Sequence, residues 1–170
     1  MPFIVRWPGH VRENHRVTDL TEHIDVPATI CDLMEIAPLK GMHGQSLRPY
    51  LEGGRVARPR DHVVAQYLEN EEAYVRTRRW KYIYGSGRRK RTDGYETDNP
   101  TPGRYKRLFD LEKDLGEFTD TAARQPAVVQ WMEELWIARM RATHPEASGE
   151  PARASREEIL NYYLRPRDAS

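Results

Sequence analysis

Residues 108–122 read LFDLEKDLGEFTDTA, and this stretch decides the fold of the second half of the chain. Residues 107–111, RLFDL, which include its apolar beginning, predict a short strand. Residues 126–141 then predict a helix, because Pro126 suits a first turn and His144-Pro145 stops the helix. Apolar side chains recur on one side of that helix, namely Val128, Val129, Trp131, Met132, Leu135, Trp136 and Met140. A stripe this wide, with two Trp, must pack against other elements.

Three runs upstream supply those elements. Residues 62–68, 73–77 and 80–84 are rich in β-branched and aromatic side chains and predict strands. The turn between the last two is Arg78-Arg79, although tight hairpins prefer Asn-Gly or Asp-Gly. Residues 85–104 predict a loop. We expect the helix to cover the strands of residues 62–111.

The first part of the chain predicts a different unit. Residues 2–9, PFIVRWPG, predict a buried strand, which needs neighbours on both edges. We therefore expect the preceding part of its sheet to be missing and its edge to be exposed. A helix is predicted over about residues 25–36, with Asp25 as N-cap and Cys31 as a buried, inert thiol. The charged residues 55–61 mark a boundary. Residues 146–170 predict a polar tail, either a loose helix or a docking arm.

Composition narrows the function classes. The 170 residues suit one domain, or a small domain plus part of another. With 38% hydrophobic residues, four Trp and nine Tyr, the chain has material for a core. A net charge of +1 argues against nucleic-acid binding by the whole chain. One cysteine excludes an intrachain disulfide, and no apolar run approaches the roughly 20 residues that span a bilayer. We expect a soluble chain with no signal pattern at its start.

Three segments, in this order, resemble the formylglycine-dependent (type I) sulfatase family. Residues 2–9 resemble the late strand of its catalytic domain. HIDVPATI at 23–30, running to GQSL at 44–47, is similar to the following helix and G-x-S-L turn. VRT at 75–77, WKYI at 80–83 and residues 108–119 resemble the C-terminal subdomain. The resemblance covers about residues 1–145, is most specific in the last segment, and is closest in look to heparan N-sulfatase-like bacterial sulfatases. Leu115 stands where the family usually has Pro.

The resemblance implies an α/β fold, more narrowly an α+β fragment. Residues 1–57 would be the last strand and helix of an alkaline-phosphatase-like sheet. Residues 58–145 would be a small antiparallel β-sheet covered by a C-terminal helix, and 146–170 the tail. The implied function is sulfuric ester hydrolysis of sulfated sugars or aryl sulfates. Full-length relatives are usually periplasmic, secreted or lysosomal.

The family's reactive groups have no counterpart in this sequence. Its nucleophile lies in a C/S-x-P/A-x-R motif, whereas Cys31 is followed by DLME. Its calcium-binding Asp pairs are absent too, so we predict no catalytic residue and no metal ligand here. Calcium would belong to the full-length enzyme, and the chain alone would be inactive. A misplaced start codon, a gene remnant and a deliberately shortened chain remain open as explanations.

Four residues are candidates for substrate contact. His10 follows the predicted strand 2–9, at the end where open α/β sheets gather ligands. Tyr67, Glu69 and Asn70 end a strand and open a loop, and the resemblance implies that this subdomain lends residues to the substrate pocket. Their alternative interpretation is a solvated turn. The six histidines show no metal-binding spacing.

A second function remains open. The run Arg88-Arg89-Lys90-Arg91 lies near several Tyr and could hold a sulfated polyanion, which would make the chain a binding module. The simpler alternative is a solvated loop. A third possibility is a structural remnant that needs a partner chain, with pairing through the exposed strand at residues 3–7.

Overall fold

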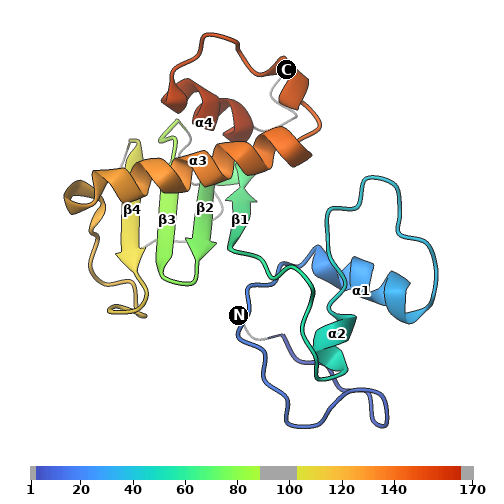
Figure 1. Cartoon of the computed structure of the whole chain (residues 1–170). Coiled ribbons are helices and arrows are strands. Elements are labelled where there is room, and N and C mark those ends of the chain that lie inside the picture. Colours follow the sequence, from blue (N-terminus) through green and yellow to red (C-terminus); the bar gives the residue numbers. More distant parts are fainter. Residues whose placement is uncertain (1–2, 89–102, 166–170) are drawn as a thin grey trace. The chain divides into compact units, whose positions relative to one another are not determined.

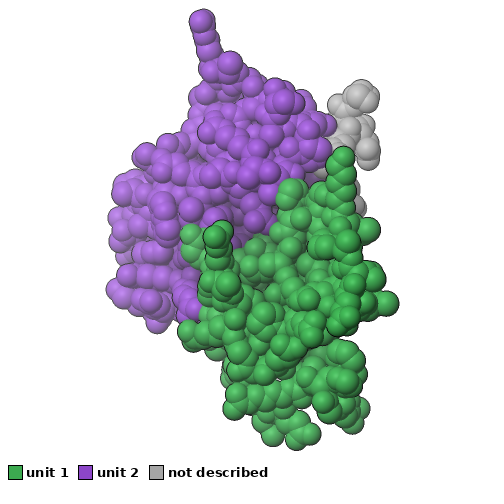
Figure 2. Space-filling model, turned by 45° about the vertical axis from the view of Figure 1, so that its right-hand side comes forward, with its two compact units in different colours: residues 1–61 green, residues 62–170 purple. Residues whose placement is uncertain are grey.

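The structure, a computed structural model, describes residues 3–88 and 103–165, apart from the side chain of Glu69. The chain forms two compact units, residues 1–61 and 62–170 (Figures 1 and 2). The assignment of these regions to domains of an enzyme stays a prediction. No helix in the described ranges is long and apolar enough to cross a membrane.

The first unit contains two helices, α1 (Asp25–Leu33) and α2 (Arg48–Leu51). Its small core consists of Leu47, Tyr50 and Val56, with Val17 packed beside them. The strand predicted over residues 2–9 is wrong for this structure, because residues 3–8 form neither strand nor helix. A strand exists only where a neighbouring strand completes its hydrogen bonds, and among the described residues of this unit none does. Phe3, Ile4 and Trp7 are consequently exposed.

Helix α1 begins where the sequence predicted, but Asp25 is not its N-cap. Ile24 occupies that position, and Asp25 lies in the first turn with its side chain fully buried. The carboxylate accepts hydrogen bonds from the backbone N–H of Glu22 (2.8 Å) and of Gln45 (2.9 Å), and it pairs with Arg60. Asp25 thus joins three segments instead of ending a helix. Cys31 is buried, as predicted.

The GQSL stretch is bound to α1 residue by residue. Ser46 Oγ donates to Asp32 (2.5 Å), and the Leu47 N–H donates to Thr29 Oγ1 (2.8 Å). Gly44 lies against the Ile24 carbonyl, where a Cβ atom would come within 1.9 Å of the oxygen. Hydrogen bonds therefore hold the turn against α1, and the turn needs glycine at position 44.

The second unit is built on a four-stranded antiparallel sheet in the order β1-β2-β3-β4. The strands are β1 (His62–Tyr67), β2 (Glu72–Thr77), β3 (Trp80–Gly85) and β4 (Tyr105–Asp110), as the sequence predicted within two residues. Arg78-Arg79 forms the β2–β3 turn despite its composition. The turn is supported by Thr77 Oγ1, which accepts from the Trp80 N–H at 2.9 Å.

Helix α3 (Pro126–Thr143) crosses one face of the sheet (Figure 1). Its stripe of Val129, Met132, Trp136 and Met140 is buried against Val75, Tyr82, Tyr84 and Leu108. Trp131, predicted within that stripe, is 44% exposed, whereas Ile137 and Glu133 are buried. The buried stripe is therefore centred slightly differently from the prediction.

The C-terminal residues are not a loose tail. Helix α4 (Arg156–Leu164) starts with a capping box between Ser155 and Glu158. Leu160, Tyr163 and Leu164 are fully buried in the same core as α3 and the sheet. The docking arm is thus the alternative that the structure favours. Three short 3-10 helices complete the unit: η1 (Leu68–Asn70), η2 (Ala122–Arg124) and η3 (Ala147–Gly149).

Candidate functional site

The predicted substrate-side residues lie at one end of the sheet, where β1 leads through η1 into β2. Tyr67 is exposed at the end of β1, and Asn70 is half-buried in η1. The Glu69 side chain lies outside the described part of the structure. The next residue, Glu71, has a φ of 51°, a left-handed conformation uncommon for a residue with a side chain. The chain therefore turns sharply at this end of the sheet.

Glu71 holds that turn against β3 and α4. Its buried carboxylate accepts hydrogen bonds from Ser86 Oγ and from Arg88 Nε, the latter at 2.7 Å, and its carbonyl accepts from the Ser86 N–H at 3.0 Å. Arg88 also donates to the Asn161 carbonyl at 3.1 Å. A charged pair of this kind fixes position more than it adds stability, because Arg88 is about half exposed to water.

This arrangement bears on the predicted anion patch. Arg88 already uses its guanidinium on Glu71 and Asn161, which leaves it poorly placed to bind a polyanion. Arg89, Lys90 and Arg91 lie outside the described residues, so the patch stays a prediction. His10 lies in the first unit, stacked on Trp7 with ring centroids 4.2 Å apart. It remains exposed to solvent. Its role at a pocket edge also stays a prediction.

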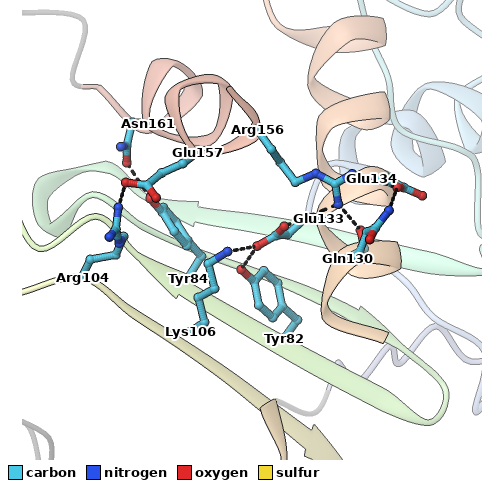
Figure 3. A network of polar contacts seen from close by, with 10 residues as sticks. All are labelled: Tyr82, Tyr84, Arg104, Lys106, Gln130, Glu133, Glu134, Arg156, Glu157 and Asn161. Atoms are coloured by element: carbon cyan, nitrogen blue, oxygen red, sulfur yellow. Dashed lines mark hydrogen bonds and ion pairs between the residues drawn. The ribbon is translucent and has the colours of Figure 1, made fainter. Parts of the chain in front are cut away.

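A second polar cluster lies between the sheet and the helices (Figure 3). At its centre Glu133 of α3 is 2% exposed. Its carboxylate accepts hydrogen bonds from the Tyr82 hydroxyl and from Lys106 Nζ, both at 2.6 Å, while Arg156 lies 3.7 Å away. Burial, followed by the nearby Glu133 charge, raises the pKa of the Tyr82 hydroxyl well above its usual value. Tyr82 therefore stays protonated and serves as a donor.

The rest of the cluster connects α4 to the strands. Tyr84 donates to Asn161 Oδ1 at 2.8 Å, and Arg104 pairs with Glu157. A shallow surface depression beside Glu133 is lined by Lys106, Ala122, Ala123, Pro126, Val129, Gln130, Glu133 and Arg156. Both cations that line it are directed at Glu133, so its charges are largely satisfied within the chain. We interpret this cluster as a structural tie between sheet and helices.

Sequence reasoning missed both carboxylates, although a signal for one was present. Glu133 stands four residues after Val129 and four before Ile137, in the middle of the apolar stripe. A charged residue in a buried stripe requires a partner, which predicts an internal ion pair. Glu71 carried no such signal, because its burial depends on a strand and a helix distant in sequence. Within residues 3–88 and 103–165 no group of three or more His, Cys, Asp or Glu side chains could hold a metal ion.

The fold defines a class of protein. The phosphonate monoester hydrolase from Silicibacter pomeroyi superposes with a TM-score of 0.61 over 85% of this chain and 29% of its own, at 20% identity. An identity this low shows shared fold alone. The chain therefore shares its fold with part of that hydrolase.

The particular family follows from sequence comparison. Residues 1–141 match the family described as N-sulphoglucosamine sulphohydrolase, C-terminal, and the chain belongs to it. An N-acetylgalactosamine-6-O-sulfatase of Bacteroides thetaiotaomicron is 31% identical over 137 residues, which cover 79% of this chain and 26% of that protein. Arylsulfatase K of Gallus gallus is 27% identical over 95% of this chain and 29% of its own length. The chain spans little more than a quarter of these relatives, and the predicted sulfatase resemblance is confirmed.

Proposed function

We propose that the chain acts as the C-terminal part of a sulfuric ester hydrolase whose substrates are sulfated sugars, with aryl sulfates as simpler substrates. The main support for this proposal is the family match over residues 1–141. The relative from Bacteroides thetaiotaomicron, named for a sulfated amino sugar, supports the sugar over the aryl ester as the main substrate.

We propose that the catalytic groups come from protein outside these 170 residues. Sulfate-ester hydrolysis needs a nucleophile and a cationic clamp on the sulfuryl oxygens. Cys31, the only thiol, is buried in α1 and is hydrogen-bonded into the helix through its backbone. Calcium needs six to eight oxygen ligands, and the described residues do not fit such a site. Calcium would therefore be held elsewhere in the full-length enzyme.

The contribution of this chain would lie on the substrate side. Tyr67, Glu69 and Asn70 follow the end of β1, and the Glu71–Arg88 pair holds the turn that presents them. A rigid base is what a specificity loop requires, since small displacements of substrate-contacting groups cost affinity. His10 stays a weaker candidate, because its ring is stacked on Trp7.

We further propose that the first unit packs against the part of the enzyme that carries the nucleophile. Besides Phe3 and Ile4, the exposed apolar side chains of this unit include Ile30, Met34, Ile36 and Leu39. Several large apolar side chains exposed on a small unit favour an interface. The extended residues 3–7 would pair there as an edge strand.

The test has two arms. The purified 170-residue chain is assayed with an aryl sulfate and with sulfated disaccharides in the presence of calcium, where we expect no turnover. A melting temperature unchanged by calcium or EDTA is expected as well. Robust turnover by the chain alone would overturn the proposal that the catalytic groups lie outside these 170 residues.

The second arm uses the coding DNA upstream of Met1. We expect a continuous reading frame that contains C/S-x-P/A-x-R, and a formylglycine-loaded product that hydrolyses sulfate esters. Hydrolysis of phosphonate monoesters without sulfatase activity would refute the substrate class.

A further inference from the structure

The helices leave one face of the sheet uncovered by any described helix of the second unit. Successive side chains of a strand point to opposite faces of the sheet. The side chains that pack against α3 and α4 include Ala73, Val75, Tyr82 and Leu108, so the residues before and after each of them in sequence point to the other face. The strand register arranges these neighbours in three rows, which we call the outer face. The rows are Val63, Arg76, Lys81 and Phe109; then Ala65, Tyr74, Ile83 and Arg107; then Tyr67, Glu72, Gly85 and Tyr105.

Aromatic rings lie flat on part of the outer face. A Cβ atom on Gly85 would come within 2.4 Å of the Tyr105 ring, so this ring lies directly over the Gly85 backbone. The Tyr105 hydroxyl donates a hydrogen bond to Glu72 on β2, across β3, and this bond holds the ring down. Tyr74, on the middle row, is 37% exposed. Sugar rings stack through their C–H faces on aromatic surfaces of this kind, because such surfaces are apolar and rigid.

Cations accompany the rings. Arg107 lies over the Tyr105 ring at 5.0 Å, and Lys81 lies 5.5 Å from the Tyr74 ring. Arg76, in the row beside Tyr74, has a buried Nε without a hydrogen-bond partner among the described residues. The residue as a whole is half-buried, so part of it is open to an acceptor from outside the chain.

The charges of the outer face are unbalanced. Arg76, Lys81 and Arg107 face a single carboxylate on the sheet, that of Glu72, which is bonded to Tyr105. Lys81 has a further partner in Glu117, at 2.5 Å. Arg76 on β2 and Arg107 on β4 stand two strands apart, roughly 10 Å. The surface is therefore complementary to a ligand with separate anionic groups.

We propose that the outer face binds a sulfated oligosaccharide, with a sugar ring on Tyr74 and sulfate groups at Arg76 and Arg107. This inference rests on the proposed function and deepens it, because it assigns a glycan-binding surface distinct from the turn at Tyr67–Asn70. Arginine suits the role, since its planar donors match the oxygens of a sulfate group in pairs. The alternative occupant is another part of the enzyme, but protein interfaces are depleted in Lys and Glu, and this face carries Lys81 and Glu72.

The experiment measures binding of a heparin octasaccharide to the full 170-residue chain by isothermal titration calorimetry, with a hyaluronan octasaccharide as the unsulfated probe. We expect binding of the sulfated probe alone, weakening as salt is added. Arg107→Gln is expected to weaken binding at least about tenfold, because a hydrogen bond to a charged group is worth that much. Tyr74→Ala is expected to weaken binding by a similar factor, because it removes the apolar ring on which the sugar stacks. Arg124→Gln, in η2, removes the same charge away from the outer face and should change affinity less than about twofold. Circular dichroism confirms that each variant is folded.

Three outcomes would overturn the proposal. One is no binding of the heparin probe, and another is equal losses in Arg107→Gln and Arg124→Gln. The third is loss of binding on replacing Arg89, Lys90 and Arg91 by Ser while Tyr74→Ala still binds, which would move the site to that run.

A separate measurement, the melting temperature, tests the alternative that another part of the enzyme covers the outer face. If Tyr74→Ala lowers the melting temperature of the longer enzyme without changing glycan binding, the outer face is a protein interface. Turnover by the longer enzyme is measured independently, so failure of the glycan surface leaves the sulfatase assignment standing. Absent turnover beside intact heparin binding would refute the sulfatase assignment alone.

Discussion

Replacing Glu133 by Ala tests whether the tie between sheet and helices holds the second unit together. The substitution removes the acceptor of the buried Tyr82 hydroxyl and leaves that donor without a partner, which costs about 1–3 kcal/mol. Loss of one buried methylene group adds about 0.8 kcal/mol. Lys106 is 38% exposed and returns to water, so its lost pair adds little. We expect the free energy of unfolding to fall by roughly 2–4 kcal/mol.

The neighbouring residue supplies a matched control. Glu134→Ala makes the same chemical change on the same helix, but Glu134 is exposed and bonds only to Gln130 and Arg156. Its cost should be too small to resolve. Urea unfolding of the full chain, followed by tryptophan fluorescence and circular dichroism, measures both variants.

A double-mutant cycle then isolates the hydrogen bond. Tyr82→Phe alone should cost about 1 kcal/mol, because Glu133 keeps Lys106. The double variant, Glu133→Ala with Tyr82→Phe, has no Tyr82 hydroxyl left without an acceptor. Its loss of stability should therefore be smaller than the sum of the two single losses by about 1–2 kcal/mol. Equal losses for the Glu133 and Glu134 variants, or strict additivity in the cycle, would refute the reasoning.

Three further predictions concern other parts of the chain. Because burial raises the pKa of Tyr82, its stabilising protonated form is complete below the tyrosine pKa of about 10 in the unfolded chain. Stability should therefore decline above that pH by up to about 1.4 kcal/mol per unit, and less steeply in Tyr82→Phe, as pH-dependent urea titrations would show. Gly44→Ala should destabilise the first unit by about 3 kcal/mol, because its Cβ would meet the Ile24 carbonyl at 1.9 Å. Gly54→Ala should cost less, because its Cβ would lie 3.2 Å from the Pro49 carbonyl and needs only a small shift; limited proteolysis of residues 1–61 compares the two variants. Ser155→Ala removes the capping box of α4 and should lower the melting temperature of the second unit by a few degrees, while an unchanged value would mean that α4 is held by packing alone.

The candidate site was only partly predictable. Tyr67 and Asn70 could be placed at a strand end because strand and turn signals are local. Glu71 could not be found in this way, since its partners Ser86, Arg88 and Asn161 are distant in sequence and meet only through the sheet and α4. The outer face was equally hidden, because its rows depend on the register of four strands.

The sequence by itself determined the strands, the long helix and the family, because apolar periodicity and the ordered segments HIDVPATI, GQSL and LFDLEKDLGEFTDTA are local patterns. Only the tertiary structure decided the rest. Residues 3–8 are no strand without a neighbour, Asp25 joins segments instead of capping a helix, and α4 belongs to the core. Each of these outcomes depends on hydrogen bonds or burial supplied by residues far along the chain, and such partners leave no trace in a local pattern.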